Sequence, residues 1–218
     1  MAQSFDLIVF DWDGTLMDSA AAIVAAIQAA CRDLALEPPT EERARHVIGL
    51  GLHDALQTAL PGLDPECYPE ITRRYRHHYL SRDHELTLFQ GAAEMLQNLL
   101  EAGFMLAVAT GKSRLGLQRA LDHSGLRRYF HATRCADECH SKPHPQRLLE
   151  LMMEFAVSPE RTLMIGDTTH DLLMAKNAGV PSLAVAYGAH PRALLEAERP
   201  LLCAATVADV HAWLLQNA

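Results

Sequence analysis

Short, mainly apolar runs recur along the chain at intervals typical of a folded α/β protein. The first, Leu-Ile-Val-Phe at residues 7–10, is followed closely by Gly14. Runs of this kind are typical of strands buried inside a parallel sheet. The predicted strands are 7–10, 105–109, 162–165 and 182–185, with a weaker pattern at 130–133.

Stretches with helical periodicity separate these runs. They cover residues 92–102, 115–124, 145–155 and 172–178. A chain that alternates strand and helix in this way builds an α/β core, so we predict a Rossmann-like, doubly wound parallel sheet. Open sheets of this class bind ligands at the carboxyl ends of their strands, where the polar motifs of this chain occur.

The longest interval between predicted strands, residues 16–88, breaks this alternation. It holds four helical patterns, at about 19–34, 41–48, 52–60 and 65–80, and Asp18 or Ser19 can cap the first of them. A single crossover between parallel strands rarely needs more than about 12 to 30 residues. We therefore predict an α/β core formed by residues 1–15 and 89–218, with an inserted α-helical cap formed by residues 16–88.

Composition and charge narrow the class of protein. The 218 residues are 49% hydrophobic and can bury a sizeable core. The net charge of −8 argues against nucleic acid or a membrane surface as a partner, because both are polyanions. The N-terminal sequence lacks the basic region of a signal peptide, and five scattered cysteines do not suggest a disulfide framework. We therefore predict a cytoplasmic globular protein.

Acidic residues stand directly after two of the predicted strands. Alternation along an extended segment lets Asp11 and Asp13 point the same way, and Asp171 lies one helical turn after Asp167. Each pair alone also fits a polar turn or a helix N-terminus. Four carboxylates at neighbouring strand ends would repel one another unless a cation lies among them. Ligation by oxygen alone suits Mg²⁺, so the pattern predicts a magnesium site here.

Two further positions suit an anion. Thr110 and Gly111 follow strand 105–109, where a hydroxyl and free backbone N–H groups can bind an anion, although an ordinary strand–helix junction has the same pattern. Lys142 is one of only three lysines and lies beside Pro143 in a loop before a predicted helix. A site with an anionic nucleophile and an anionic substrate needs a cation, and Lys142 is the best placed to supply it.

These segments together resemble the four motifs of the haloacid dehalogenase superfamily, in its phosphatase branch. The segments are Asp11-Trp12-Asp13-Gly14-Thr15, Thr110-Gly111, Lys142-Pro143 and Gly166-Asp167 with Asp171. The helical insertion falls where that family inserts its C1 cap, and phosphoglycolate phosphatase-like proteins are the most similar in appearance. The resemblance implies a phosphatase in which Asp11 attacks phosphorus to form an aspartyl-phosphate while Asp13 serves as acid and base.

The same resemblance implies the roles of the other residues. Mg²⁺ would be held by Asp11, the backbone carbonyl of Asp13, Asp167 and Asp171, the last directly or through water. Thr110, Gly111 and Lys142 would hold the phosphoryl oxygens. The cap would exclude water and select the organic part of a small phosphorylated metabolite.

Substrate identity stays open at this point. Arg45 and His53 flank the 49–51 loop and are candidates for binding a substrate carboxylate, although each also fits a solvated helix face. Alternative functions are a β-phosphoglucomutase-like phosphotransferase, a nucleotide or pyrophosphate hydrolase, and a non-catalytic regulatory protein that binds a phospho-ligand. The chain has every charged position of the motifs, which favours an enzyme, and it can be a monomer or a homodimer.

Three other features receive simpler interpretations. Cys135, Cys139, His140 and His144 form a C-x₃-C-H-x₃-H pattern that invites a zinc site, but the spacing is unusual and overlaps the Lys142 loop. We therefore predict no zinc there. We expect Trp12 to pack in the core and His170 to face solvent.

Overall fold

A parallel sheet of six strands forms the centre of the molecule. The computed structural model describes residues 4–218, so the first three residues of the predicted core segment 1–15 lie outside it. The strand order is β3-β2-β1-β4-β5-β6. The strands are β1 (Leu7–Phe10), β2 (Met105–Ala109), β3 (Ala132–Arg134), β4 (Thr162–Gly166), β5 (Ser182–Val185) and β6 (Leu202–Ala204). The predicted α/β class with a doubly wound parallel sheet is confirmed.

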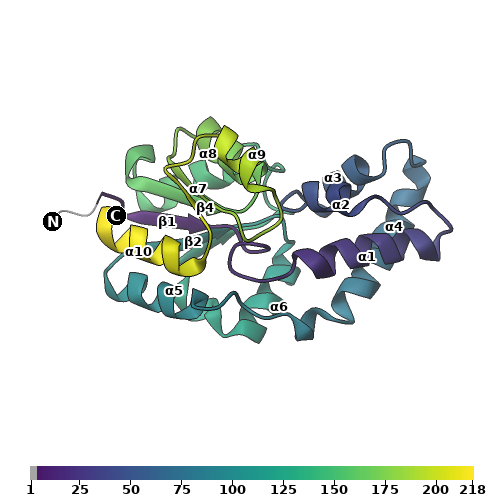
Figure 1. Cartoon of the computed structure of the whole chain (residues 1–218), viewed down its shortest axis with the longest axis horizontal. Helices are drawn as coiled ribbons and strands as arrows, with labels where there is room; N and C mark the ends of the chain where they lie inside the picture. Colours follow the sequence, from purple (N-terminus) through teal and green to yellow (C-terminus); the bar gives the residue numbers. More distant parts are fainter. Residues whose placement is uncertain (1–3) are drawn as a thin grey trace.

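Helices cover both faces of the sheet (Figure 1). On one side lie α5 (Ala92–Glu101), α6 (Arg114–Ser124) and α10 (Val207–Asn217), and on the other α7 (Gln146–Phe155), α8 (Thr169–Asn177) and α9 (Arg192–Ala197). Because side chains alternate along a strand, Ile8 and Phe10 pack toward the first group and Leu7 and Val9 toward the second. β1 is therefore apolar throughout, and it pairs with β2 on one side and β4 on the other.

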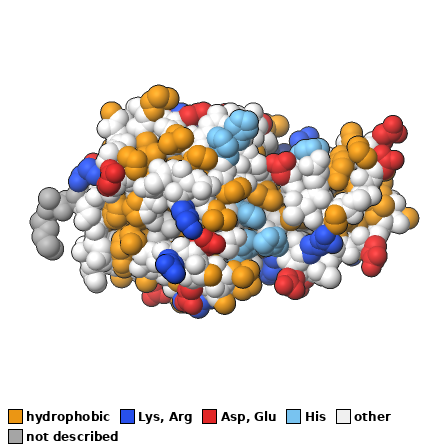
Figure 2. All heavy atoms as spheres, turned by 90° about the horizontal axis from the view of Figure 1, so that it is seen from above, with side chains coloured by type: hydrophobic (Ala, Val, Ile, Leu, Met, Phe, Trp, Pro, Cys, Tyr) orange, Lys and Arg blue, Asp and Glu red, His pale blue; other side chains and the backbone are white. Residues whose placement is uncertain are grey.

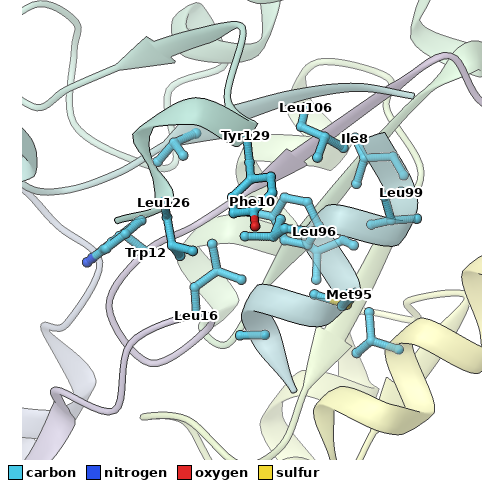
Figure 3. Close-up of a cluster of buried hydrophobic side chains, with 14 of the residues drawn as sticks. Ile8, Phe10, Trp12, Leu16, Met95, Leu96, Leu99, Leu106, Leu126 and Tyr129 are labelled. Carbon is cyan, nitrogen blue, oxygen red and sulfur yellow. The ribbon is translucent and has the colours of Figure 1, made fainter. Parts of the chain in front are cut away.

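The apolar layer beneath α5 continues past the end of β1. Trp12 and Leu16 join Phe10 and Leu96 in this layer, as Figure 3 shows. Trp12 has no exposed surface, which agrees with its expected place in the core. Packing of Trp12 and Leu16 anchors the segment that carries Asp11 and Asp13, so both acids are held at the strand end.

The structure departs from the predicted elements at the sheet edges. The weak pattern at 130–133 becomes β3 at Ala132–Arg134, and β6 at Leu202–Ala204 was not predicted. Both strands have only three residues and include half-buried positions, so their apolar pattern is too short to recognise. Short 3₁₀ turns occur at η1 (Pro65–Cys67), η2 (Asp83–Glu85), η3 (Leu126–Tyr129) and η4 (Pro159–Arg161).

The interval after β1 forms a separate group of four helices at one end of the molecule (Figure 1). We call it the α1–α4 unit, residues 20–80, and it comprises α1 (Ala20–Asp33), α2 (Glu41–His46), α3 (Leu52–Ala59) and α4 (Tyr68–Leu80). Ile27 and Ala59 belong to one buried cluster of this unit, and Leu56 and Ile71 to a second. The predicted helix at 65–80 is split, because Asp64 caps a 3₁₀ turn before α4 begins.

The two connections between the α1–α4 unit and the sheet run side by side. The Asp18 N–H donates to Thr87 O at 2.9 Å, and the Phe89 N–H donates to Leu16 O at 3.0 Å. The boundaries predicted from the sequence, at 15/16 and 88/89, lie in or beside this paired segment. Within residues 4–218, no helix combines the length and apolar character needed to cross a membrane.

Candidate active site

Three carboxylates meet at the carboxyl ends of β1 and β4. Asp11 follows β1 directly, Asp167 follows β4, and Asp171 lies in the first turn of α8. One oxygen from each lies within 4.8 Å of the others, and all three residues are fully buried. Gly14 makes room for this group, since its φ is +79° and a Cβ there would lie 2.1 Å from Asp167 Oδ2.

Lys142 supplies the positive charge next to these acids. Its Nζ lies 2.8 Å from Asp11 Oδ1 and 2.6 Å from Asp171 Oδ1, and its side chain has no exposed surface. Burial lowers the pKa of Lys142, but the charges of Asp11 and Asp171 outweigh burial and hold this pKa above its ordinary value. Lys142 is therefore a charged ammonium in direct contact with the predicted nucleophile.

The positive groups near Asp11 and Asp167 do not fully offset the negative charge of the buried acids. Burial, opposed by Lys142 and reinforced by Asp171, raises the pKa of Asp11 to about 7. Burial and the Asp11 charge also raise the pKa of Asp167. Asp11 Oδ2 accepts no hydrogen bond from the part of the chain that the structure describes. A cation bound among these oxygens would relieve that excess charge.

Asp167 and Asp171 are held by local hydrogen bonds. Asp167 Oδ1 accepts from the Thr15 hydroxyl at 2.9 Å, and Asp167 Oδ2 accepts from the Ala189 N–H at 2.8 Å. Thr168, not Asp167, is the N-cap of α8, and Asp171 completes a capping box with it. Asp171 thus caps the first turn of the helix and also contacts Lys142.

Asp13 lies apart from the three-carboxylate group, which corrects the expectation that four carboxylates converge. Both of its carboxylate oxygens lie 3.0 Å from Lys112 Nζ, and Oδ1 also accepts from the Ser19 hydroxyl at 2.6 Å. Ser19 precedes α1 but makes no side-chain cap bond, because its hydroxyl is used by Asp13. The fully extended alternation assumed from the sequence does not hold, since the chain bends at Trp12 and turns at residues 14–16.

Lys112 links the sheet to the α1–α4 unit, and sequence reasoning missed it. Its Nζ donates to Tyr79 Oη on α4 at 2.9 Å as well as to Asp13. Burial lowers the pKa of Lys112, but the charge of Asp13 and the contact with Tyr79 raise it above its ordinary value. The available signal was its position directly after Gly111 in a chain with three lysines.

Thr110 and Gly111 lie at the end of β2, on the same edge of the sheet. Thr110 is fully buried, and its hydroxyl accepts a hydrogen bond from the Lys112 N–H at 3.2 Å. A Cβ on Gly111 would lie 2.4 Å from Leu50 O and 2.5 Å from Gly49 O. Glycine therefore allows the loop between α2 and α3 to approach the strand end closely.

A cavity of about 650 Å³ lies between this strand edge and the α1–α4 unit. Asp11, Asp13, Thr110 and Gly111 line its core side, while Lys142, Asp167 and Asp171 lie behind this lining. The predicted nucleophile therefore lines a partly open space between the sheet edge and the α1–α4 unit.

The two substrate-binding candidates from the α1–α4 unit differ in position. His53 lines the cavity, with its ring 5.5 Å from that of Tyr68. Arg45 does not line it and pairs with Glu41 on the surface of α2 at 2.9 Å. Arg76 and Arg119 line the cavity instead, and the sequence did not distinguish them from other surface arginines.

The cysteine and histidine pattern at 135–144 does not form a metal site. Across residues 4–218, the only group of three or more side chains placed to hold a metal ion is Asp11, Asp167 and Asp171. Cys135 is buried in the core under α5 and α6, and burial raises the pKa of its thiol to about 12.

His170 was expected to face solvent, but its ring instead lies against two other histidine rings. Its ring lies 5.5 Å from His46 and 5.2 Å from His190, and its Nε2 lies 2.8 Å from His46 O. His46 ends α2, so these rings form a contact between the α1–α4 unit and the sheet half. Figure 2 shows histidine side chains near the middle of the molecule, where the two halves meet.

Arg147 is a second buried cation near the site that the sequence did not reveal. It lies in the first turn of α7 and is fully buried, and none of its guanidinium nitrogens has a hydrogen-bond partner among the residues described. Burial lowers its pKa, while the charges of Asp11 and Asp171 act in the opposite direction. Its positive charge therefore adds to that of Lys142 behind the acids.

Comparison with known proteins gives a consistent result. The family model described as haloacid dehalogenase-like hydrolase matches residues 8–185. A protein of Dickeya dadantii named probable phosphatase IndB is 37% identical over 94% of this chain and 91% of its own length. A phosphoglycolate phosphatase of Agrobacterium fabrum is 33% identical over 84% of this chain and 81% of its own length.

Solved structures agree with these matches. A crystal structure described as a predicted phosphoglycolate phosphatase from Haemophilus somnus superposes with a TM-score of 0.86, at 26% identity, over 96% of this chain and 98% of that one. The predicted hydrolase class and family are thereby confirmed. The chain belongs to the haloacid dehalogenase-like hydrolase family.

Proposed function

We propose that this protein hydrolyses a small phosphomonoester through a phosphorylated Asp11. The observation that carries the proposal is the contact of Asp11 with Lys142 beside Asp167 and Asp171, at the bottom of a cavity. A carboxylate nucleophile next to a fixed ammonium is suited to attack a phosphate dianion, because the ammonium offsets the repulsion between the two anions. Relatives named phosphatases and phosphoglycolate phosphatases support the same reaction class.

The carboxylate group also fits Mg²⁺. Three buried carboxylate oxygens lie within 4.8 Å of one another, and Asp11 Oδ2 has no hydrogen-bond donor in the described part of the chain. Oxygen ligands of this kind suit Mg²⁺, and Asp11, Asp167 and Asp171 would hold it, with the Asp13 backbone carbonyl as the fourth ligand from the chain. When bound, the ion would neutralise charge on the phosphate and on Asp11.

The residues of this chain account for each step of the reaction. An Asp11 oxygen bonds to phosphorus while the ester P–O bond breaks, and the Asp13 carboxyl gives its proton to the leaving alkoxide. Asp13 then takes a proton from water, the water oxygen bonds to phosphorus, and the Asp11–phosphorus bond breaks. Inorganic phosphate leaves and Asp11 is restored. Lys142, Thr110 and the Gly111 N–H hold the phosphoryl oxygens through both steps.

The α1–α4 unit acts as the cap in this proposal. It forms one side of the cavity and limits the access of water to the phosphorylated Asp11. The contact between Lys112 and Tyr79 connects this cap to the acid–base residue Asp13. The cap therefore helps to orient the side chain that handles the proton.

The decisive experiment measures phosphate release from a panel of phosphorylated metabolites, 2-phosphoglycolate included, with Mg²⁺ present. p-Nitrophenyl phosphate serves as a general substrate, because its leaving group needs no protonation. We expect release that Asp11→Asn eliminates. No release from any ester of the panel would refute the proposal and favour a non-catalytic protein that binds a phospho-ligand.

A further inference from the structure

We propose that the organic group of the substrate is uncharged, mainly apolar and larger than two carbons. The inference rests on the phosphatase function proposed above and concerns the same site. The structure assigns the α1–α4 wall of the cavity, namely Ile23, Ile27, Val47, Ile48, Leu50, Tyr75 and Tyr79, as the surface that binds this group.

The first argument is the size of the cavity. Its volume of about 650 Å³ equals roughly 20 water molecules at about 30 Å³ each. That is within the range of pockets that hold drug-sized ligands. A two-carbon acid such as phosphoglycolate would leave most of this space to water, whereas a longer organic group would displace that water.

The second argument is the chemistry of the wall. Ile23 and Ile27 come from α1, and Val47, Ile48 and Leu50 come from the segment that follows α2. Tyr75 and Tyr79 come from α4 and stack with ring centroids 5.8 Å apart. The hydrogen bond from Lys112 to Tyr79 Oη fixes the second of these rings. Ile23, Ile27, Val47 and Ile48 are already buried, so the accessible part of the wall is mainly Leu50, Tyr75 and Tyr79. This accessible carbon favours an apolar group, because burial of apolar surface releases water.

The third argument is the charge around the cavity. Lys112 pairs with Asp13, and Arg119 pairs with Asp83 at 2.8 Å. Within the described chain, Arg76 is the only lysine or arginine of the lining without an ion pair, and it is exposed. Asp54 and Asp137 also line the cavity and repel anions. Apart from Arg76 and the ring of His53, a substrate carboxylate would therefore meet no unpaired basic side chain among the described residues of the lining.

The primary test uses the unchanged protein and a series of alkyl phosphates. Ethyl, propyl, butyl and hexyl phosphate are compared with 2-phosphoglycolate by kcat/KM, with p-nitrophenyl phosphate and Asp11→Asn as activity controls. We expect kcat/KM to rise about fourfold for each added methylene, equivalent to about 0.8 kcal/mol, until the wall is covered. We expect 2-phosphoglycolate to be at least about tenfold poorer than propyl phosphate, because its carboxylate loses hydration against apolar side chains.

Variants localise the effect to the wall. Leu50 is half-buried and lines the cavity, so Leu50→Ser should lower kcat/KM for hexyl phosphate several-fold while leaving ethyl phosphate nearly unchanged. Leu149→Ser, on the exposed face of α7, is the matched control and should leave the whole series unchanged. Arg76→Ala tests the competing interpretation, in which this arginine binds a substrate carboxylate.

The outcomes separate this inference from the proposed function. A flat alkyl series alongside Asp11-dependent release from p-nitrophenyl phosphate would overturn the inference and leave the phosphatase intact. A preference for 2-phosphoglycolate that Arg76→Ala removes would overturn it as well. No release from any ester would refute the phosphatase itself, and the inference with it.

Discussion

The two sides of the cavity differ in chemistry: one consists of buried charged groups and the other of apolar side chains. The sheet side concentrates Asp11, Asp167, Asp171 and Lys142 with almost no exposed surface. The α1–α4 side presents isoleucine, valine and tyrosine and has few unpaired charges. Charges buried in a rigid sheet cost folding free energy and are kept where a reaction needs them, whereas an apolar wall both stabilises the fold and selects a ligand.

This difference indicates how the two sides can change independently. The sheet side depends on a few atoms in contact at 2.6 to 2.8 Å, so a single substitution there should remove the reaction. The helical side depends on summed apolar contact, so substitutions there should shift substrate preference gradually. The predictions below test that contrast, from the largest expected effect to the smallest.

Asp11→Asn should have the largest effect. An amide cannot act as the nucleophile, so we expect kcat for p-nitrophenyl phosphate to fall by at least about 10³-fold. Steady-state kinetics with circular dichroism would show lost activity with a retained fold. Asp18→Asn, at an exposed position nearby, is the matched control. Activity close to that of the unchanged protein in the Asp11 variant would exclude Asp11 as the nucleophile.

Removal of divalent metal should reduce turnover to background. The three buried carboxylates would then repel the substrate phosphate, because Lys142 and the more distant Arg147 offset their charge only in part. Phosphate release after treatment with EDTA, followed by addition of Mg²⁺, measures the effect and its reversal. Turnover that persists in metal-free buffer would argue against a metal site at Asp11, Asp167 and Asp171.

Lys142→Met should lower kcat by about 10²- to 10³-fold at saturating Mg²⁺, since it removes a charge that stabilises the transition state. It also leaves Asp11 and Asp171 without their buried partner, so the melting temperature should fall. Lys176→Met, at an exposed lysine on α8, is the control for loss of one positive charge. Equal kinetics in the two variants would show that Lys142 has no special role.

Without metal, Asp11 should make stability depend on pH. Burial first, then Asp171, raises the pKa of Asp11 to about 7 from an ordinary value near 3.8. Between these values the unfolded state loses its proton while the folded state retains it, so the free energy of unfolding falls as pH rises. The Asp11→Asn variant has no carboxyl group at this position, so its free energy of unfolding does not fall in this way. In EDTA its melting temperature should therefore exceed that of the unchanged protein by a margin that grows from pH 4 to pH 7.

Melting curves at several pH values, with and without Mg²⁺, measure this effect. A constant difference between the two proteins would show that Asp11 titrates in the folded state as it does in the unfolded state. Such a result would also argue against the interpretation that the buried acids on the sheet side lower the free energy of unfolding.

Tyr79→Phe should have the smallest effect. It removes one hydrogen bond to Lys112, worth about 1 kcal/mol, and should lower kcat/KM by about three- to tenfold for alkyl phosphates. p-Nitrophenyl phosphate should be less affected, because its leaving group does not need the proton that Asp13 supplies. Tyr68→Phe, on the same helix, is the matched control, since its hydroxyl has no hydrogen bond within residues 4–218. An equal fall in kcat/KM for alkyl phosphates and p-nitrophenyl phosphate would show that Tyr79 does not assist proton transfer by Asp13.

The sequence by itself determined four of the six strands and the positions of the chemical groups that follow them. Strands β1, β2, β4 and β5 are local apolar runs, and parallel strands place the residues that follow them at one edge of the sheet. Asp11, Thr110 and Asp167 could therefore be placed before any coordinates. Lys142 was identified by charge and scarcity, and its contact with Asp11 agrees with that choice.

Only the tertiary structure decided the remaining features. Lys112 meets Asp13 across 99 positions of sequence and Tyr79 across 33, so no local pattern reveals either contact. The same holds for the choice of Arg76 over Arg45 at the cavity and for the burial of Arg147. Local periodicity reports which face of an element is apolar, but not which neighbour covers it. The cavity wall depends on how two packed units meet, and that arrangement depends on contacts between segments that lie far apart in the sequence.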